Sequence, residues 1–256
     1  MKKLNLNKIE KFVISNTKTQ SPTHGFGHLQ RTAKGAEWFA EVFGSSKEEQ
    51  EIAYLGGLIH DLKRPSSEKV DHTNLSVEEG KKVLEKFNIS AETAKKILEL
   101  ISLHREFNNV PLSSQWVFLA DKLLEQSGAF LIFRRSYYIG ECEDFKNSTL
   151  FESTLPYWTK RMEKFSPEKF DKRVRKLADY QYKWNKEFVD NFSKKMSWAV
   201  KLAKIFFEYG RQGEKNLEQL IKDYKPEDNN SDMIKKEALD YLSGKKYKDF
   251  QKMIKL

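Results

Sequence analysis

Residues 52–61 read Ile-Ala-Tyr-Leu-Gly-Gly-Leu-Ile-His-Asp, and this stretch decides the fold. Its apolar residues recur at spacings of three and four, which is typical of the buried face of an α-helix. That apolar face leads directly into His60 and Asp61. The same helical periodicity continues through nearly the whole chain, and no stretch sustains the strict alternation of a half-buried strand. We therefore expect an all-α protein.

Apolar periodicity, together with the positions of proline and of helix-capping residues, predicts where the helices lie. No internal repeat and no Gly/Ser-rich or Pro-rich linker interrupts them. The predicted helices are 5–15, 28–43, 47–62, 74–87, 91–104, 113–138 with a break near Gly128, 147–163, 168–208, 213–223 and 231–242.

The composition is that of a folded chain without a membrane span. The 256 residues are 39% hydrophobic and 32% charged, and no apolar run approaches the roughly 20 residues that a spanning helix needs. The first residues lack the apolar segment of a signal peptide, so we expect a cytoplasmic protein with no membrane partner. Cys142 is the single cysteine, so a metal ion would have to be bound by histidine and carboxylate.

Histidine and charge are distributed unevenly. All five histidines lie in the first 104 residues, whereas the net charge of +9 comes mainly from the second half. This distribution places the candidate chemistry in the first half and a basic surface in the second. The histidines are His24, His28, His60, His72 and His104.

Several ionisable residues occupy positions where the helical pattern calls for an apolar one. Asp121 lies four residues after Val117 and three before Leu124, and His104 lies three after Ile101. Burial of such groups is costly unless a hydrogen bond, a cation or a metal ion compensates it. Each residue taken alone is explained by a hydrogen-bonded core histidine or a paired aspartate.

Taken together, these residues favour a metal site. Four separate helices would bring His28, His60 with Asp61, His104 and Asp121 to their buried sides. Imidazole with carboxylate is the ligand mixture of Zn, Mn, Fe and Co sites. One metal ion would compensate all of these groups at once.

Three segments resemble the HD superfamily of metal-dependent phosphohydrolases, in particular the small HD hydrolases and nucleotide pyrophosphohydrolases. The resemblance covers roughly residues 20–140 and implies an HD-domain helical bundle. The segments are His24-Gly-Phe-Gly-His28-Leu-Gln-Arg31, Tyr54-Leu-Gly-Gly-Leu-Ile-His60-Asp61, and Ala120-Asp121-Lys122-Leu-Leu-Glu-Gln-Ser-Gly128-Ala129 followed by Arg134.

The resemblance implies a divalent metal cofactor, Mn, Fe, Co, Mg, Ni or Zn, as one or two ions. The dinuclear branch of the superfamily has extra histidines where His72 and His104 stand, so Asp61 would there bridge two ions. His72 could instead contact substrate or lie in an exposed loop. The ligands implied for one ion are His28, His60, Asp61 and Asp121.

The activity that the resemblance implies is hydrolysis of a nucleotide or another small phosphate ester by a metal-bound hydroxide. A metal ion lowers the pKa of its bound water towards ~7, and Asp61 would be the catalytic residue that orients or deprotonates this water. Arg31 is a candidate for the same phosphate contact as the other cations, or pairs with an acidic side chain. The candidate phosphate-binding residues are Arg64, Lys63, Lys122, Arg134, Arg31 and His24.

We expect residues 1–140 to form the catalytic core and residues 141–256 a basic helical extension packed on it. The expected partner is a small phosphorylated substrate, with a nucleotide favoured, and a homodimer is an open alternative. The substrate itself and the role of the extension are not determined by the sequence.

Two other classes of function compete with the enzyme. A nucleic-acid-binding protein would use the basic residues of 160–176 and 194–215 and would stack bases on interleaved aromatics. This alternative is less favoured, because aromatics at helical spacing more often belong to the core. A catalytically silent metal or nucleotide sensor is the third class. The aromatics in question are Trp158, Tyr180, Tyr182 and Trp184.

Overall fold

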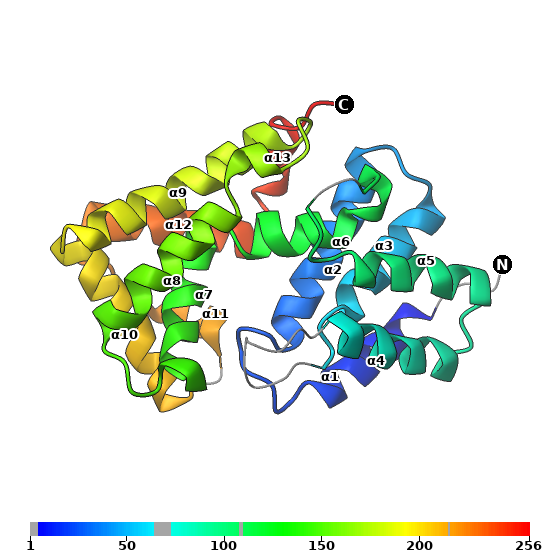
Figure 1. Cartoon of the computed structure of the whole chain (residues 1–256), viewed down its shortest axis with the longest axis horizontal. Helices are drawn as coiled ribbons and strands as arrows, with labels where there is room; N and C mark the ends of the chain where they lie inside the picture. The colour runs from blue at the N-terminus through cyan, green and yellow to red at the C-terminus, as the bar shows by residue number, and fades with distance from the viewer. Residues whose placement is uncertain (1–4, 64–72, 108–109, 215) are drawn as a thin grey trace. The chain divides into compact units, whose positions relative to one another are not determined.

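Figure 1 shows the computed structural model of the chain, which describes residues 5–63, 73–107, 110–214 and 216–256. These residues form α-helices with short 3₁₀ and π turns, and no β-strand occurs among them. The all-α prediction is confirmed. Contacts divide the chain into two compact units, residues 1–125 and 126–256. Within the described ranges, no helix has the combination of length and apolar character needed for a membrane span.

The first unit contains the described histidines together with Asp61 and Asp121. Helix α3 begins at a capping box in which Ser46 and Glu49 bond each other's main chain, and Ser90 caps α5; such caps satisfy amide groups that a helix start leaves open. The elements are α1 (Leu6–Asn16), α2 (Phe26–Val42), α3 (Lys47–Ile59), α4 (Thr73–Lys86), α5 (Ala91–Ser102), η1 (Leu112–Ser114), α6 (Trp116–Leu119) and η2 (Ala120–Glu125).

Glycines allow α2 to lie very close to its neighbours. A Cβ atom at Gly57 of α3 would stand 2.6 Å from the Cα atom of Ala33 on α2. A Cβ atom at Gly35 would stand 3.0 Å from the Cβ atom of Ala120 in η2. The first distance is shorter than real Cβ atoms show and the second is tighter than most Cβ contacts, so the two glycines permit the packing of α2 on α3 and on η2.

The predicted helix 113–138 is interrupted, as expected. Helix α6 ends at Leu119, η2 continues as a π-helical turn to Glu125, and α7 begins at Gly128. Gly128 has φ +80°, a left-handed conformation that costs glycine little. The break near Gly128 is therefore confirmed, whereas the π turn before it was not predicted.

The second unit is built around the contact of α7 with α10. A Cβ atom at Gly140 would overlap the carbonyl oxygen of Phe207, and one at Gly210 would overlap that of Tyr137. The two helices therefore touch through their backbones. The elements are α7 (Gly128–Glu141), η3 (Glu143–Phe145), α8 (Leu150–Lys164), η4 (Pro167–Lys169), α9 (Arg175–Ser193), α10 (Ser197–Gln212), α11 (Leu217–Asp223), α12 (Asn229–Leu242) and α13 (Tyr247–Gln251).

The single helix predicted over 168–208 is wrong. Helix α9 ends at Ser193 and α10 begins at Ser197. Between them Lys195 adopts φ +56°, and the amide of Met196 donates to the carbonyl of Asn191 at 2.9 Å. This is a Schellman-type helix end, which usually carries glycine at the left-handed position. Here the left-handed residue is a lysine, so no glycine marks the end of this helix in the sequence. The short helix α13 was not predicted either.

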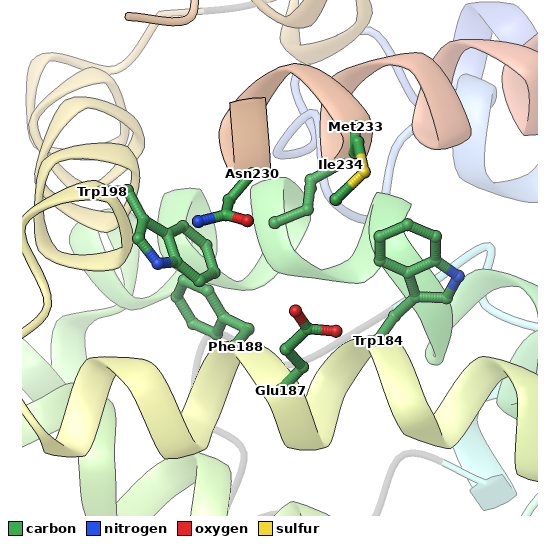
Figure 2. Close-up of a pocket in the computed structure, with 7 residues that line it drawn as sticks. All are labelled: Trp184, Glu187, Phe188, Trp198, Asn230, Met233 and Ile234. Atoms are coloured by element: carbon green, nitrogen blue, oxygen red, sulfur yellow. The ribbon is translucent and has the colours of Figure 1, made fainter. Parts of the chain in front are cut away.

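The aromatic residues of the second unit belong largely to its core. Trp158 is 1% exposed and packs on Phe188 with ring centroids 5.5 Å apart. Figure 2 shows Trp184 and Trp198 on opposite sides of a small hollow whose other walls come from α9 and α12. The hollow has a volume of about 10 Å³, the space of one water molecule, and so does not hold a nucleobase.

The unit boundary falls before α7, whereas the sequence predicts a boundary after residue 140. The packing of residues 141–256 on a core of residues 1–140 stays a prediction. The same holds for homodimer formation.

Candidate metal centre

Three buried side chains from different elements converge in the first unit. His28 comes from the first turns of α2, His60 caps the C-terminus of α3, and Asp121 lies in η2. One potential ligand atom from each lies within 4.8 Å of those from the other two. All three residues are 0% exposed. The close approach of α2 to α3 and η2 is what brings them together.

His60 has its two ring nitrogens in different environments. Nδ1 lies 2.8 Å from the carbonyl oxygen of Gly57, which requires Nδ1 to carry the proton and donate. Nε2 then has a lone pair, and among the described residues this buried atom has no hydrogen-bond partner. A buried polar atom left in this way is costly unless something else binds it. The environment of Nε2 therefore fits a metal ligand.

Asp61 and His104 lie beside this group. Asp61 is 1% exposed and His104 is 0% exposed. Oδ1 of Asp61 is 3.7 Å from Nε2 of His104, and Oδ2 is 3.7 Å from Nε2 of His60. Nδ1 of His104 donates to the carbonyl oxygen of Ile101, so Nε2 is the nitrogen that faces Asp61. A second carboxylate and a third imidazole thus adjoin the cluster.

His28 is oriented by a carboxylate that the sequence reasoning did not identify. Its Nδ1 lies 2.9 Å from Oε2 of Glu125, while its Nε2 lies 3.6 Å from Oδ1 of Asp121. Glu125 also accepts hydrogen bonds from Nε and Nη2 of Arg31, at 2.8 Å and 3.0 Å. A histidine that donates one nitrogen to a carboxylate presents the other nitrogen to a metal.

Two carboxyl groups of the site are ionised despite complete burial. Burial raises the pKa of Asp121, but Lys122, His60 and His28 outweigh burial and hold this pKa well below its usual range. Burial likewise raises the pKa of Glu125, and Arg31 and His28 more than offset it. Glu125 is paired with Arg31, so the ionised Asp121 is the carboxylate that places negative charge among the potential ligand atoms, which favours a cation.

Burial lowers the pKa values of His104 and Lys122, whereas it raises those of the carboxyl groups. Burial, reinforced by the positive charge of Lys122, lowers the pKa of His104 to about 3. His104 is therefore neutral at pH 7 and keeps its Nε2 lone pair. Burial also lowers the pKa of Lys122 against the attraction of Asp121, whose carboxylate accepts a hydrogen bond from the Lys122 ammonium.

The remaining predicted residues differ in their placement. His24 is 8% exposed, and its ring lies 6.2 Å from that of His28. The side chain of Lys63 is 60% exposed and pairs with Glu79 on α4. Arg134 is buried on α7, in the second unit. His72 and Arg64 lie outside the described residues.

Glu125 could have been found from its spacing. It lies four residues after Asp121, and Arg31 lies three after His28. Residues three or four apart share one face of a helix. The spacing therefore places the two side chains of each pair on the same face. The structure shows Arg31 paired with an acidic side chain, Glu125, and this carboxylate is buried.

Comparison with known proteins gives one family. Residues 25–125 match the family model described as HD domain. The match contains His28, His60, Asp61, His104 and Asp121, and it ends at the last residue of the first unit. No curated protein and no solved structure matches the chain.

Proposed function

We propose that this chain, whose residues 25–125 match the HD-domain family model, hydrolyses a nucleotide or another small phosphate ester with the help of a bound divalent metal ion. The observation that carries the proposal is the buried group of His28, His60 and Asp121, with ligand atoms within 4.8 Å of one another. A catalytic metal site in proteins commonly has such a set of imidazole and carboxylate donors.

The residues present fit a divalent metal. Nε2 of His60 is buried without a hydrogen-bond partner among the described residues, and ionised Asp121 supplies negative charge beside it. Imidazole donors favour Mn, Fe, Co, Ni or Zn over Mg. When bound, such an ion lowers the pKa of water and polarises the phosphate group.

Asp61 is the proposed proton acceptor. Its two carboxylate oxygens lie 3.7 Å from Nε2 of His104 and Nε2 of His60, and both nitrogens present lone pairs because their Nδ1 atoms donate to main-chain carbonyls. A general base must stand near the attacking water and hold its proton. Asp61 would take this proton on one of its carboxylate oxygens. His104 is also the candidate ligand for a second ion, and whether one or two ions bind stays open.

Lys122 is the proposed cation for the developing negative charge. It is 7% exposed and its ammonium bonds Asp121. Positive charge in a site from which water is excluded stabilises a phosphoryl transition state more strongly than it would in water. Arg134, Lys63, Arg64 and His24 remain predicted phosphate contacts.

The test is a panel of nucleotides and simple phosphate esters, assayed with the purified full chain and Mn²⁺, Fe²⁺, Co²⁺, Mg²⁺, Ni²⁺ or Zn²⁺. We expect release of phosphate or pyrophosphate from at least one substrate. His60→Ala removes a metal ligand and Asp61→Asn removes the base, so we expect turnover to fall by about 10²–10⁴-fold. Bound metal is measured in the same samples by elemental analysis.

Glu237→Gln is the matched control, because Glu237 accepts hydrogen bonds from Tyr180 and Lys246 in the second unit. We expect this variant to turn over as the wild type does. Wild-type rates in His60→Ala and Asp61→Asn would contradict the proposal. Metal binding without release from any substrate would favour the sensor alternative.

The nucleic-acid alternative has less support from the basic segment 160–176. Several of its cations bond within the second unit: Arg173 pairs with Asp171 at 2.9 Å, and Arg175 donates to the carbonyl oxygen of Phe170. These arginines hold the turn before α9. Their positive charge is therefore partly engaged in the fold.

A further inference from the structure

Glu125 is a fully buried carboxylate that accepts hydrogen bonds from side chains of α2. His28 contributes Nδ1, and Arg31 contributes Nε and Nη2. Taking a carboxylate out of water costs several kcal/mol unless its lone pairs are well satisfied. Here a bidentate guanidinium and an imidazole satisfy them, and the side chain of Arg31 is itself only 12% exposed.

His28 differs from the other two histidines of the centre in what fixes its ring. His60 and His104 donate Nδ1–H to main-chain carbonyls three residues before them. His28 instead donates to a charged side chain from a different element. A carboxylate in this position fixes the tautomer and makes the opposite nitrogen a stronger donor to metal.

The π-helical turn contributes to this arrangement. Asp121 and Glu125 both lie in η2, and Asp121 faces Nε2 of His28 while Glu125 faces Nδ1. One short turn therefore contacts both nitrogens of the same ring. π turns inside helices occur frequently at functional sites, and here the turn places one carboxylate on each side of His28.

We propose that Glu125, itself held by Arg31, is a positioning residue that sets the orientation and donor strength of His28 towards the metal ion. The inference rests on the proposed metal centre and adds to it a pair of residues that do not touch the metal or the substrate. It also gives Arg31 a role in the support of His28 in place of a contact with substrate phosphate.

The competing explanation is purely structural. A buried ion pair between α2 and η2 would hold these elements together, and its loss would lower stability without any specific effect through His28. The two explanations differ in whether the effect of Glu125 on metal binding depends on the imidazole of His28. A double-mutant cycle measures this dependence.

The experiment measures the dissociation constant of Co²⁺ by competition with a chelator, and the visible absorption spectrum of the bound Co²⁺. The proteins are the full-length wild type, Glu125→Gln, His28→Ala and the double variant. We expect Glu125→Gln to weaken Co²⁺ binding by about 10–100-fold and to shift the absorption bands. In the His28→Ala background, Glu125→Gln should cause no further loss. Glu237→Gln should bind Co²⁺ as the wild type does.

Wild-type Co²⁺ affinity in Glu125→Gln, or an equal loss with and without His28, would overturn the inference. So would wild-type affinity in His28→Ala, since His28 would then not be a ligand. If Glu125→Gln does not fold, Arg31→Met replaces it in the same cycle, with a smaller expected loss because the bond from His28 to Glu125 remains. Failure of the phosphohydrolase proposal would show separately, as intact Co²⁺ binding and intact coupling without release of phosphate.

Discussion

His104 is a buried imidazole with a pKa of about 3 in the folded chain, compared with about 6.5 when it is exposed. Between these values the unfolded chain binds a proton that the folded chain does not. Stability must therefore fall as the pH decreases below about 6.5 and continue to fall towards pH 3. We expect metal-free protein to unfold at lower urea concentration at pH 5.5 than at pH 7.5.

The contribution of His104 is isolated by His104→Gln, which keeps a polar side chain but cannot bind the proton. We expect the midpoint of this variant to depend less steeply on pH than that of the wild type. Other titrating groups are present in both proteins, so the difference between the two slopes reports His104. Equal slopes would show that burial of His104 does not contribute to the loss of stability in acid.

At single residues, the sequence predicted best where a polar group broke an apolar pattern. Asp121 and His104 were found in this way, and both are buried. Glu125 lies four residues after Asp121 and so shares its spacing, but its burial depends on a partner, Arg31, that lies far away in sequence. Lys63 was proposed from its nearness to Asp61 in the sequence, but the structure pairs its exposed side chain with Glu79.

Among the elements, the contact of α2 with α3 determines how close the helix that carries His28 lies to the helix that ends at His60. Gly57→Ala would place a Cβ atom 2.6 Å from the Cα atom of Ala33, so the helices must separate. We expect a loss of about 1–3 kcal/mol in the free energy of unfolding, together with weaker Co²⁺ binding as His28 and His60 move apart. Urea denaturation and chelator competition measure the two effects.

Gly80→Ala on α4 is the comparison for this variant. The nearest atoms to a Cβ atom there would be the ends of the Ile101, Leu98 and Ile59 side chains, at 3.1 Å, 3.3 Å and 3.7 Å, and these ends can shift. Alanine is also the better helix former. We expect stability close to that of the wild type and unchanged Co²⁺ binding. If Gly57→Ala behaves like Gly80→Ala, the close helix approach does not control the centre.

Helix existence was predictable and helix ends were less so. Capped starts such as Ser46 and Ser90 are marked by residue type. The end of α9 is not marked by residue type, because a lysine, Lys195, adopts the left-handed conformation that glycine usually adopts at helix ends. The π turn of η2 is equally hidden, because every residue of α6 and η2 is buried and the segment has no exposed face whose spacing an extra residue would shift.

For the whole molecule, the division into two units predicts which helices a bound metal ion protects from hydrogen exchange. A ligand present at 100 times its dissociation constant stabilises the state that binds it by about 2.7 kcal/mol. We expect Co²⁺ to slow hydrogen exchange in α2, at the end of α3 and in η2, and to leave α9, α10 and α12 unchanged. Exchange detected by mass spectrometry of peptides, with and without Co²⁺, measures this. Protection spread equally over both units would contradict the prediction.

The sequence indicated two functional halves from the positions of histidine and charge, but not the boundary between the units. No proline-rich or glycine-rich linker separates the two units, and the amino-acid composition does not change at the junction of Glu125 and Gln126. The boundary depends on which helices pack together, and those contacts join residues that lie far apart in the chain. The end of the family match at residue 125 agrees with the unit that the contacts define.

The backbone contact of α7 with α10 has a consequence for the order in which the chain folds. Gly140 and Gly210 meet their partner helices only after α8 and α9, which lie between them in sequence, have been made. Helices α2 and α3, by contrast, are neighbours in sequence and close a short loop. Contacts between distant parts of a chain form more slowly than local ones. During synthesis the histidine-bearing half can therefore assemble its centre while the second half still awaits its last helices.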